Sequence, residues 1–210
     1  GAGTNIIEIE GVKSLHGVEY TIIPDRIEAG TYAVVAAISK GEVRIRHIDF
    51  DHLKPITTKL KDAGVHIEEI ENGLLVAVRN RLNAVDVKTL PYPGFPTDMQ
   101  APLMSLMSLA DGISVFTETI FENRFMHVSE MKRMGADIRV EGHSAIVRGV
   151  ERLTGAQVTA PDLRAGVALI LAGLAAEGVT EITGIEHIDR GYEDIEAKLT
   201  DLGATISRSA

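Results

Sequence analysis

Two arginines stand at matching places along the chain, and together they could bind an anionic substrate. Arg124 lies 12 residues after Gly112, and Arg190 lies 12 residues after Gly178. Each arginine is expected to follow a strand and to precede a helix, where free backbone N–H groups and a guanidinium favour a phosphate or a carboxylate. The alternative is that both are ordinary exposed arginines. A third matching position holds Leu53, so the fold itself does not require a charge there.

Two aspartates also correspond, and either could act on a substrate hydroxyl. Asp98 and Asp162 each stand three residues before the alanine that opens an expected helix. A carboxylate at such a place can serve as a general base, or it can simply cap the helix. Asp98 is favoured as the base because the proline-rich segment 91–97 fixes its position. Asp162 either caps its helix or orients Arg164, two residues further on.

Other reactive patterns are weak or absent from the sequence. His47 and His52 flank Asp49 and Asp51, but this arrangement is typical of a solvated loop, and the seven histidines include no HExxH motif. No metal site is therefore expected. The sequence also lacks Walker A, GxGxxG and GxSxG motifs. Nucleotide hydrolysis by a P-loop, dinucleotide binding and α/β-hydrolase chemistry thus have no motif to support them.

The composition narrows the classes of function further. Among 210 residues, 30 are acidic and 21 are Lys or Arg, which gives a formal net charge of −9, and none is Cys. Nucleic-acid binders carry a basic face, so no nucleic-acid partner is expected, and an anion site must be a local arginine cluster. The lack of cysteine is typical of the cytoplasm. No signal peptide opens the chain, and its longest apolar stretch, residues 165–176, is shorter than the ~20 residues that span a membrane.

The elements that must position these side chains form one sequence unit that is repeated three times. In each unit a glycine ends an apolar helix and precedes a strand, and a second glycine ends another helix and precedes a second strand. The glycine pairs are Gly41 and Gly64, Gly112 and Gly135, and Gly178 and Gly203. The second strands are expected around Ile67, Ile138 and Ile206.

Two of the three units end in a further pair of expected strands. These pairs are 74–78 with 85–89, and 145–150 with 157–160. The third unit reaches Ala210 without such a pair, while the N-terminus holds an unassigned pair at 6–10 and 18–23. Either that pair closes the third unit or it belongs to something missing upstream.

The first helix of each unit is apolar on nearly every face, which predicts that it is buried. These helices are expected at 32–38, 103–109 and 167–176. The spacings of Met104 with Met107 and of Phe121 with Phe125 are interpreted as core packing. The second helices are more amphipathic and can lie across a surface. The sequence therefore predicts a mixed α and β (α+β) fold of βαβαββ units, with buried helices and sheets outside.

Several segments resemble a known family, in the order in which that family has them. They are PDRIEAGT at 24–31, FPTDMQA at 95–101, ETIFENRFMH at 118–127, LTGAQV at 153–158, DLRA at 162–165 and HIDRGYE at 187–193. On these residues the chain resembles the UDP-N-acetylglucosamine enolpyruvyl transferases (1-carboxyvinyltransferases) of bacterial peptidoglycan synthesis. The segments at 95–100 and 122–125 are the most specific, and they separate this family from the related 5-enolpyruvylshikimate-3-phosphate synthases.

The resemblance implies an inside-out α/β barrel and a chain that is the C-terminal half of such an enzyme. Residues 1–22 would be the tail of the missing partner domain, and residues 23–210 the three-repeat transferase domain. The repeats would span about 23–90, 91–160 and 161–210. In the family the other half supplies a Lys-Asn pair and a mobile loop whose Cys, or Asp in some members, acts as the acid. This chain has no Cys.

The resemblance also implies roles for particular residues. Asp98 would contact the sugar 3-hydroxyl and take its proton, and Arg190 would bind phosphoenolpyruvate. The remaining substrate-binding residues would be Arg124 and Arg164 in the same anion cluster, Asp162 as a polar partner near the reacting carbon, and Ile120 with Phe121 against the UDP-sugar. The family reaction uses no metal or other cofactor, so the partners expected are UDP-N-acetylglucosamine, phosphoenolpyruvate and the missing N-terminal domain.

Two other functions remain open at this point. The chain could be a non-catalytic binding or assembly module that keeps the fold, which the missing half favours. A sister enzyme with a different acceptor hydroxyl is disfavoured by the segment at 95–100. By itself the chain is expected to fold, to lack enolpyruvyl transfer, and to self-associate through the face meant for the other domain.

Overall fold

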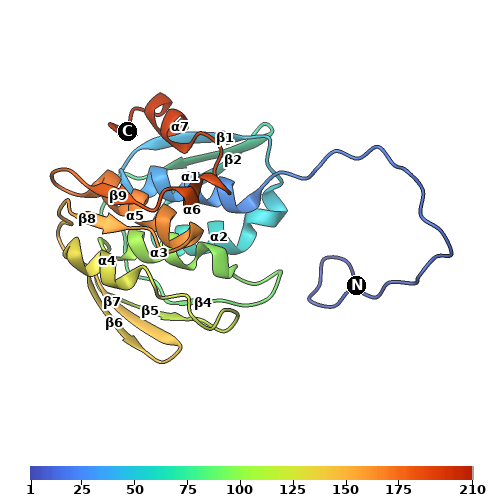
Figure 1. The fold of residues 1–210 in the computed structure, drawn as a ribbon, viewed down its shortest axis with the longest axis horizontal. Helices are drawn as coiled ribbons and strands as arrows, with labels where there is room; N and C mark the ends of the chain where they lie inside the picture. The colour runs from blue at the N-terminus through green and yellow to red at the C-terminus, as the bar shows by residue number, and fades with distance from the viewer. Residues whose placement is uncertain (210) are drawn as a thin grey trace.

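Three apolar helices lie at the centre of the molecule, and short sheets surround them (Figure 1). The computed structural model describes residues 1–209. Within that range the helices are α1 (Arg26–Ile38), α2 (Phe50–Asp62), α3 (Gln100–Met107), α4 (Val128–Arg133), α5 (Leu163–Ala175), α6 (Glu186–Asp189) and α7 (Ile195–Asp201), with a 3-10 turn at Thr97–Met99. The central helices are α1, α3 and α5, which pack against one another. The expectation of buried helices with sheets outside is confirmed.

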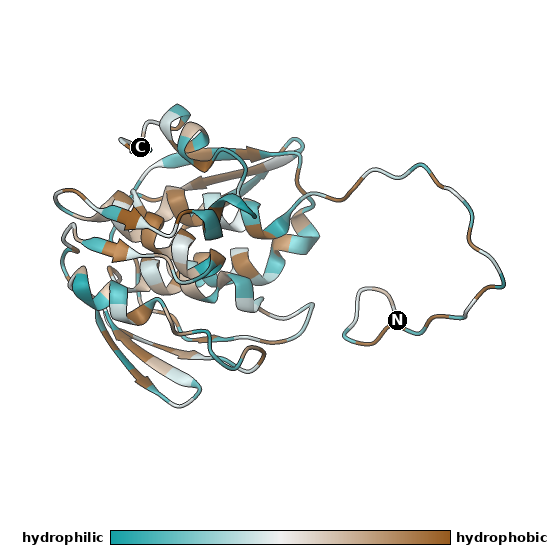
Figure 2. Cartoon of the chain, in the orientation of Figure 1, coloured by the Kyte–Doolittle hydropathy of each residue, from teal (hydrophilic) through white to brown (hydrophobic). Residues whose placement is uncertain are grey.

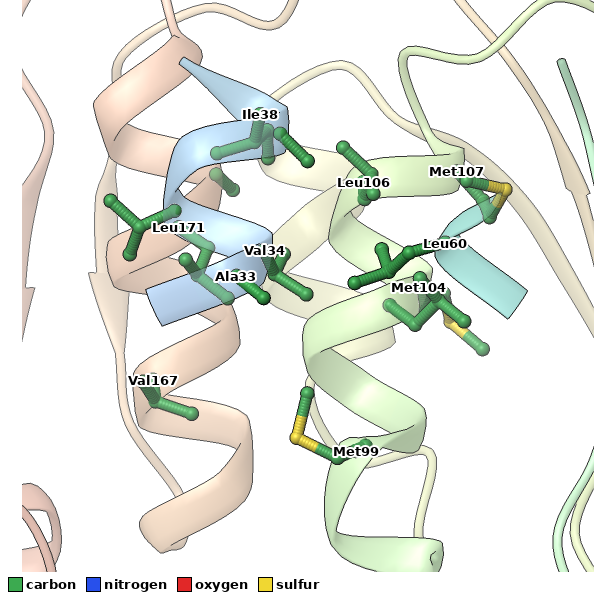
Figure 3. Close-up of a cluster of buried hydrophobic side chains, with 14 of the residues drawn as sticks. Ala33, Val34, Ile38, Leu60, Met99, Met104, Leu106, Met107, Val167 and Leu171 are labelled. Atoms are coloured by element: carbon green, nitrogen blue, oxygen red, sulfur yellow. The ribbon is translucent and has the colours of Figure 1, made fainter. Parts of the chain in front are cut away.

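Figure 3 shows how the central helices fill the core. Val34 of α1, Met104 of α3 and Leu171 of α5 are fully buried, as is Met107. Burying one such side chain is worth about 1.5–3 kcal/mol, so the contacts between these helices are a main source of stability. Among residues 1–209, none of the helices is both long and apolar enough to cross a membrane.

Aspartate side chains begin two of the central helices. Asp25 Oδ1 accepts hydrogen bonds from two backbone N–H groups of α1, at 2.7 and 3.2 Å. Asp162 Oδ1 does the same for α5, at 2.7 and 2.9 Å. These bonds satisfy N–H groups that have no partner inside the helix. For Asp162 the capping alternative is therefore confirmed.

The first two units build sheets of the same topology. The strands are β1 (Glu42–Arg46), β2 (His66–Ile70), β3 (Gly73–Ala77), β4 (Val87–Lys88), β5 (Ile113–Thr117), β6 (Asp137–Glu141), β7 (Ser144–Arg148), β8 (Gln157–Thr159) and β9 (Glu181–Thr183). In the first sheet β3 lies between β1 and β2 and runs antiparallel to both, and β7 lies in the same way between β5 and β6. The last strand of each unit then pairs parallel with the first strand of the next, as β4 with β5 and β8 with β9.

The glycines that end the second helices adopt a conformation that side chains disfavour. Gly64, Gly135 and Gly203 have φ angles of 98°, 91° and 95°. A glycine in this left-handed region turns the chain out of a helix without a steric penalty from a Cβ atom. The same device at three matching positions confirms the glycine spacing read from the sequence.

The structure differs from expectation in the N-terminal arm, residues 1–23, and near Ile206. The strands expected at 6–10, 18–23 and around Ile206 are not formed, and residues 1–25 are exposed throughout. In Figure 1 the arm runs away from the body of the molecule. A strand needs a neighbour to receive its backbone hydrogen bonds, and these segments have none in residues 1–209. The assignment of residues 1–22 to a missing partner domain stays a prediction.

A buried histidine joins α4 to the core. His127 is fully buried, its Nε2 lies 3.2 Å from Met104 Sδ, and its Nδ1 has no hydrogen-bond partner in residues 1–209. Burial lowers the pKa of His127 to about 4, although the carboxylate of Asp162 acts in the opposite sense. The ring is therefore neutral near pH 7.

We expect this histidine to make the fold sensitive to acid. An unfolded histidine has a pKa of about 6.5, so between pH 6.5 and 4 the unfolded chain binds more protons than the folded one. The free energy of unfolding should fall by up to about 1.4 kcal/mol per pH unit as the pH drops through that window. Urea unfolding of wild type and His127→Leu measures the difference, and His143→Gln, at an exposed position, is the control. Equal losses in wild type and His127→Leu would contradict the expectation.

Candidate active site

Three charged side chains from distant segments meet at the N-terminal ends of α3 and α5. Arg124 Nη2 donates a hydrogen bond to Asp98 Oδ1 at 2.7 Å, and Arg164 Nε lies 3.2 Å from the same oxygen. Asp98 is in the 3-10 turn before α3, Arg124 is in the loop after β5, and Arg164 is in the first turn of α5. The structure thus brings together three of the residues that the sequence singled out.

Asp98 does not cap a helix. Neither the 3-10 turn nor α3 has a side-chain capping bond at its N-terminus. The Asp98 side chain is 36% exposed, and its Oδ2 makes no hydrogen bond to residues 1–209. One oxygen is therefore held by arginines while the other is free to meet a ligand.

A second, buried carboxylate fixes the loop that carries Arg124. Glu118 is 2% exposed, and its Oε1 accepts hydrogen bonds from Thr89 Oγ1 (2.7 Å) and from the N–H groups of Ile120 (2.8 Å) and Phe121 (3.0 Å). Its Oε2 accepts a hydrogen bond from Thr97 Oγ1 at 2.9 Å. A buried carboxylate is tolerated when hydrogen bonds satisfy it in this way.

Thr97 connects the buried carboxylate to the charged cluster. Its hydroxyl donates to Glu118 and accepts a hydrogen bond from Arg124 Nε at 3.1 Å. Sequence reasoning missed both Thr97 and Glu118 as parts of the site. Their signal was weak: each lies inside a segment that resembles the family, but neither stands at a repeated position.

Ile120 and Phe121 form an exposed edge beside the arginines. Their side chains are 44% and 51% exposed, so the interpretation of Phe121 as core packing is wrong. The guanidinium of Arg124 instead lies over the Phe121 ring, 4.7 Å from its centre. Such a cation–π contact leaves one face of an aromatic ring available to solvent or a ligand.

Tyr192 is a further member of the site that the sequence did not reveal. It is 2% exposed, and its hydroxyl accepts a hydrogen bond from Arg164 Nη1 at 3.3 Å and lies 2.9 Å from Thr31 Oγ1. Burial raises the pKa of Tyr192, so its hydroxyl keeps its proton near pH 7. Arg164 is thereby held between the tyrosine and Asp98. Asp162 accepts a hydrogen bond from the backbone N–H of Arg164, and within residues 1–209 it makes no ion pair with the guanidinium.

Arg190 does not join this cluster in the structure. It is exposed, and it makes no side-chain hydrogen bond or ion pair within residues 1–209. It lines a hollow of about 670 Å³ beside Tyr192, together with several acidic residues and Arg208. A short helix, α6, separates it from β9, so its surroundings differ from those of Arg124 despite the matched spacing. A site shared by the two arginines stays a prediction.

The part of the chain that the structure describes offers no group of three or more His, Asp or Glu side chains that could hold a metal ion. His52 Nε2 lies 3.6 Å from Asp49 Oδ2, and this pair joins a half-buried histidine of α2 to the exposed aspartate that caps the helix. Around Asp98 the structure instead gathers charged side chains of both signs. Two guanidiniums, which can bind a phosphate or a carboxylate, stand beside a carboxylate oxygen that makes no hydrogen bond within residues 1–209 and can accept one from a hydroxyl.

Comparison with known proteins identifies the family of the chain. The model of the family described as EPSP synthase (3-phosphoshikimate 1-carboxyvinyltransferase) matches residues 1–199. Curated relatives named UDP-N-acetylglucosamine 1-carboxyvinyltransferase are 58% identical in Halothermothrix orenii and 60% identical in Caldanaerobacter subterraneus subsp. tengcongensis. Each alignment includes 99% of this chain and 50% of the relative. The chain therefore spans about half the length of the curated relatives it matches.

Solved structures share the fold. The enolpyruvyl transferase NikO from Streptomyces tendae matches 90% of this chain with a TM-score of 0.79 and 27% identity, over 45% of its own length. EPSP synthase from Acinetobacter baumannii matches 91% of this chain with a TM-score of 0.69 and 19% identity, again over 45% of its length. The repeats, the buried helices and these matches lead to one conclusion: the chain belongs to the EPSP synthase family of enolpyruvyl (1-carboxyvinyl) transferases.

Proposed function

We propose that this chain is the C-terminal half of a UDP-N-acetylglucosamine 1-carboxyvinyltransferase, which acts in the cytoplasm at the first committed step of peptidoglycan synthesis. The acceptor is inferred from the names of the curated relatives, which are 56–60% identical over nearly the whole chain. An N-terminal domain would complete the substrate cleft. Activity of the parent enzyme and both of its substrates are parts of this proposal.

The observation that carries the proposal is the state of Asp98. One carboxylate oxygen is held by Arg124 and Arg164, and the other makes no bond within residues 1–209. A general base must lie within hydrogen-bond reach of the proton that it removes, and its position must be fixed. The proline-rich approach and the two arginines fix this carboxylate beside an exposed edge formed by Ile120 and Phe121.

The reaction assigns one task to this carboxylate. Asp98 takes the proton from the sugar 3-hydroxyl as its oxygen bonds to C2 of phosphoenolpyruvate, and an acid from the other domain protonates C3. The resulting tetrahedral intermediate then loses phosphate as the bond between C2 and the phosphate ester oxygen breaks, and C3 returns a proton to the conjugate base of that acid, which forms the enolpyruvyl ether. No electrons are gained or lost overall, so the step needs no redox partner.

The arginines supply the positive charge that this reaction requires. Phosphoenolpyruvate carries a phosphate and a carboxylate, and negative charge shifts to the phosphate oxygens as the bond breaks. Arg164 stands in the first turn of α5, Arg124 in the loop between β5 and α4, and Arg190 at the C-terminal end of α6. In a protein of net charge −9, the proposal requires the bound substrates and the other domain to bring Arg190 and the Arg124–Arg164 pair to one anion, because within residues 1–209 Arg190 lines a separate hollow with acidic residues.

We expect that Asp98→Asn in the full-length parent lowers kcat by about 10²–10⁴-fold, because the amide cannot accept the proton. The side chain keeps its size and its Oδ1 can still accept hydrogen bonds from Arg124 and Arg164, so the chain should stay folded, with a moderate fall in melting temperature from the lost ion pairs. Steady-state phosphate release and thermal unfolding measure both quantities. Asp137→Asn is the matched control, because Asp137 of β6 forms an exposed ion pair with Arg148. Near-normal kcat with a large loss of stability would show that Asp98 is structural.

We expect that Arg190→Ala and Arg124→Ala in the parent act mainly through phosphoenolpyruvate, and in different ways. Loss of Arg190, which has no protein partner in residues 1–209, should raise KM for phosphoenolpyruvate by about 10–100-fold, as the loss of a charge-assisted contact predicts. Loss of Arg124 should also lower kcat, because it releases Asp98. The surface variant Arg139→Ala is the control. Unchanged phosphoenolpyruvate kinetics in both variants would refute the shared site.

We expect that the 210-residue chain by itself folds cooperatively but does not release phosphate from the two substrates. The acid and half of the cleft lie outside it, and positioning of both substrates supplies most of the catalysis. Phosphate release by protein of verified mass is the measurement. Turnover above background would mean that the chain contains a complete site.

A further inference from the structure

The sheets are unequal, and two of them end in unpaired edges. β5 has β4 on one side and β7 on the other, whereas within residues 1–209 β1 has only β3 and β9 has only β8. By comparison with the second sheet, β1 lacks a parallel neighbour and β9 lacks an antiparallel one. Such edges expose backbone N–H and C=O groups that readily accept a further strand. The third unit thus leaves room for two strands.

The N-terminal arm carries the sequence pattern of the strand pair that closes the second unit. Residues 11–25 read GVKSLHGVEYTIIPD, and residues 149–162 read GVERLTGAQVTAPD. The initial Gly-Val, the next Leu and Gly, a Thr and the final Pro-Asp correspond, with one additional residue before Pro24. Both segments end in the aspartate that caps the next central helix, Asp25 for α1 and Asp162 for α5.

Apolar residues of the arm fall where the closing strands face the core. Ile9 aligns with Val147 of β7, which is fully buried, and Tyr20 aligns with Val158 of β8, which is 2% exposed. In the arm these two side chains are 86% and 73% exposed, and Figure 2 shows hydrophobic stretches along its whole length. Glu10 aligns with an exposed position of β7. This pattern is typical of a strand pair whose apolar side chains have no core to pack against.

A hydrogen bond found in the first two units has no counterpart in the third. The N–H of Asn83 reaches the carbonyl of Ala63 at 2.9 Å, and the N–H of Thr154 reaches the carbonyl of Met134 at 2.8 Å. Both acceptor residues are fully buried. The matching residue after α7 is Leu202, which is 48% exposed and receives no such bond in the described residues. The residue that aligns with Asn83, whose backbone N–H would donate this hydrogen bond, lies in the arm.

The core is also incomplete at the place where the arm would pass. A hollow of about 600 Å³ is lined by the C-terminal ends of α1, α3 and α5, with Leu82 and Arg152 from the closing loops of the first two units. Leu82 and its counterpart Leu153 are 6% and 0% exposed. The third counterpart is Leu15, which is 92% exposed in the arm. Docking would bring Leu15 to the end of α1, beside Lys40.

We propose that in the 210-residue chain the N-terminal arm docks on its own body and closes the third unit. Residues 19–21 pair parallel with β1, as β8 pairs with β9. Residues 6–10 pair antiparallel with β9, as β7 pairs with β5. The occupant is the chain's own arm because it is already joined to α1, so its effective concentration is about millimolar, above that of a second copy in dilute solution.

The register of this pairing brings opposite charges together. Glu19 stands opposite Arg44, at the place where Gln157 of β8 donates a hydrogen bond of 2.9 Å to Glu181 of β9. Facing opposite charges stabilise a strand pair. The strand before α1 and the strand after it then form a crossover of the common right-handed type, as β8, α5 and β9 do. One additional residue before Pro24 makes the connection at least as long as its counterpart.

Engineered cysteines test this pairing directly, because the chain has none of its own. Glu19→Cys combined with Arg44→Cys should form a disulfide within one chain under mild oxidation, seen by intact mass and by mobility on a non-reducing gel. Glu19→Cys combined with Ile45→Cys is the control, since neighbouring residues of a strand face opposite sides. A disulfide between two chains would mean that the arm is exchanged with a second copy, and no disulfide would mean that it does not dock. Either result overturns the proposal.

Hydrogen exchange tests the docking without new cysteines. Peptides that contain residues 6–10 and 18–22 should exchange at least tenfold more slowly than an unstructured chain. Ile9→Asp should remove this protection while α1, α3 and α5 stay protected. Glu8 would face Glu181 on the outer surface, so Glu8→Lys should slow exchange further. Exchange of the wild-type arm at the unstructured rate would overturn the proposal.

Discussion

The candidate site depends on one interaction, the ion pairing of Asp98 with Arg124 and Arg164. The three side chains come from the segments before α3, before α4 and at the start of α5, so the pairing ties two repeats together at one end of the central helices. Burying a guanidinium is costly unless it is paired. Arg124 is 8% exposed, and this cost makes its pairing with Asp98 and Thr97 obligatory. The same pairing leaves Asp98 Oδ2 free.

The fold was predictable wherever one physical rule decided the outcome. A helix that is apolar on every face must be buried, and this rule assigned α1, α3 and α5 to the interior. Glycines at the ends of the second helices, Gly64, Gly135 and Gly203, set the common register of the three units. The prediction of an N-terminal strand pair was wrong for the described structure. Alternation of apolar and polar residues gives a segment its strand character but does not provide the neighbouring strand that it must pair with.

The candidate site was predictable only in part. Matched spacing gives the place of a residue on the backbone, and the resemblance added roles, so Asp98, Arg124 and Arg164 could be grouped. Spacing does not give the direction or the partners of a side chain. The exposed position of Arg190 beside a separate hollow could therefore not be predicted from its spacing. Glu118 escaped prediction because its importance comes from burial and four accepted hydrogen bonds, which the chain determines only after folding.

In the proposed reaction the free oxygen of Asp98 receives the proton of the acceptor hydroxyl. The most direct measurement is a crystal structure of the full-length enzyme with UDP-N-acetylglucosamine and a non-reacting analogue of phosphoenolpyruvate. We expect the sugar 3-hydroxyl within about 2.6–3.2 Å of Asp98 Oδ2, with the analogue's anionic groups against Arg124, Arg164 and Arg190. A 3-hydroxyl bound to another basic group, with Asp98 remaining outside hydrogen-bond distance of the sugar, would contradict it.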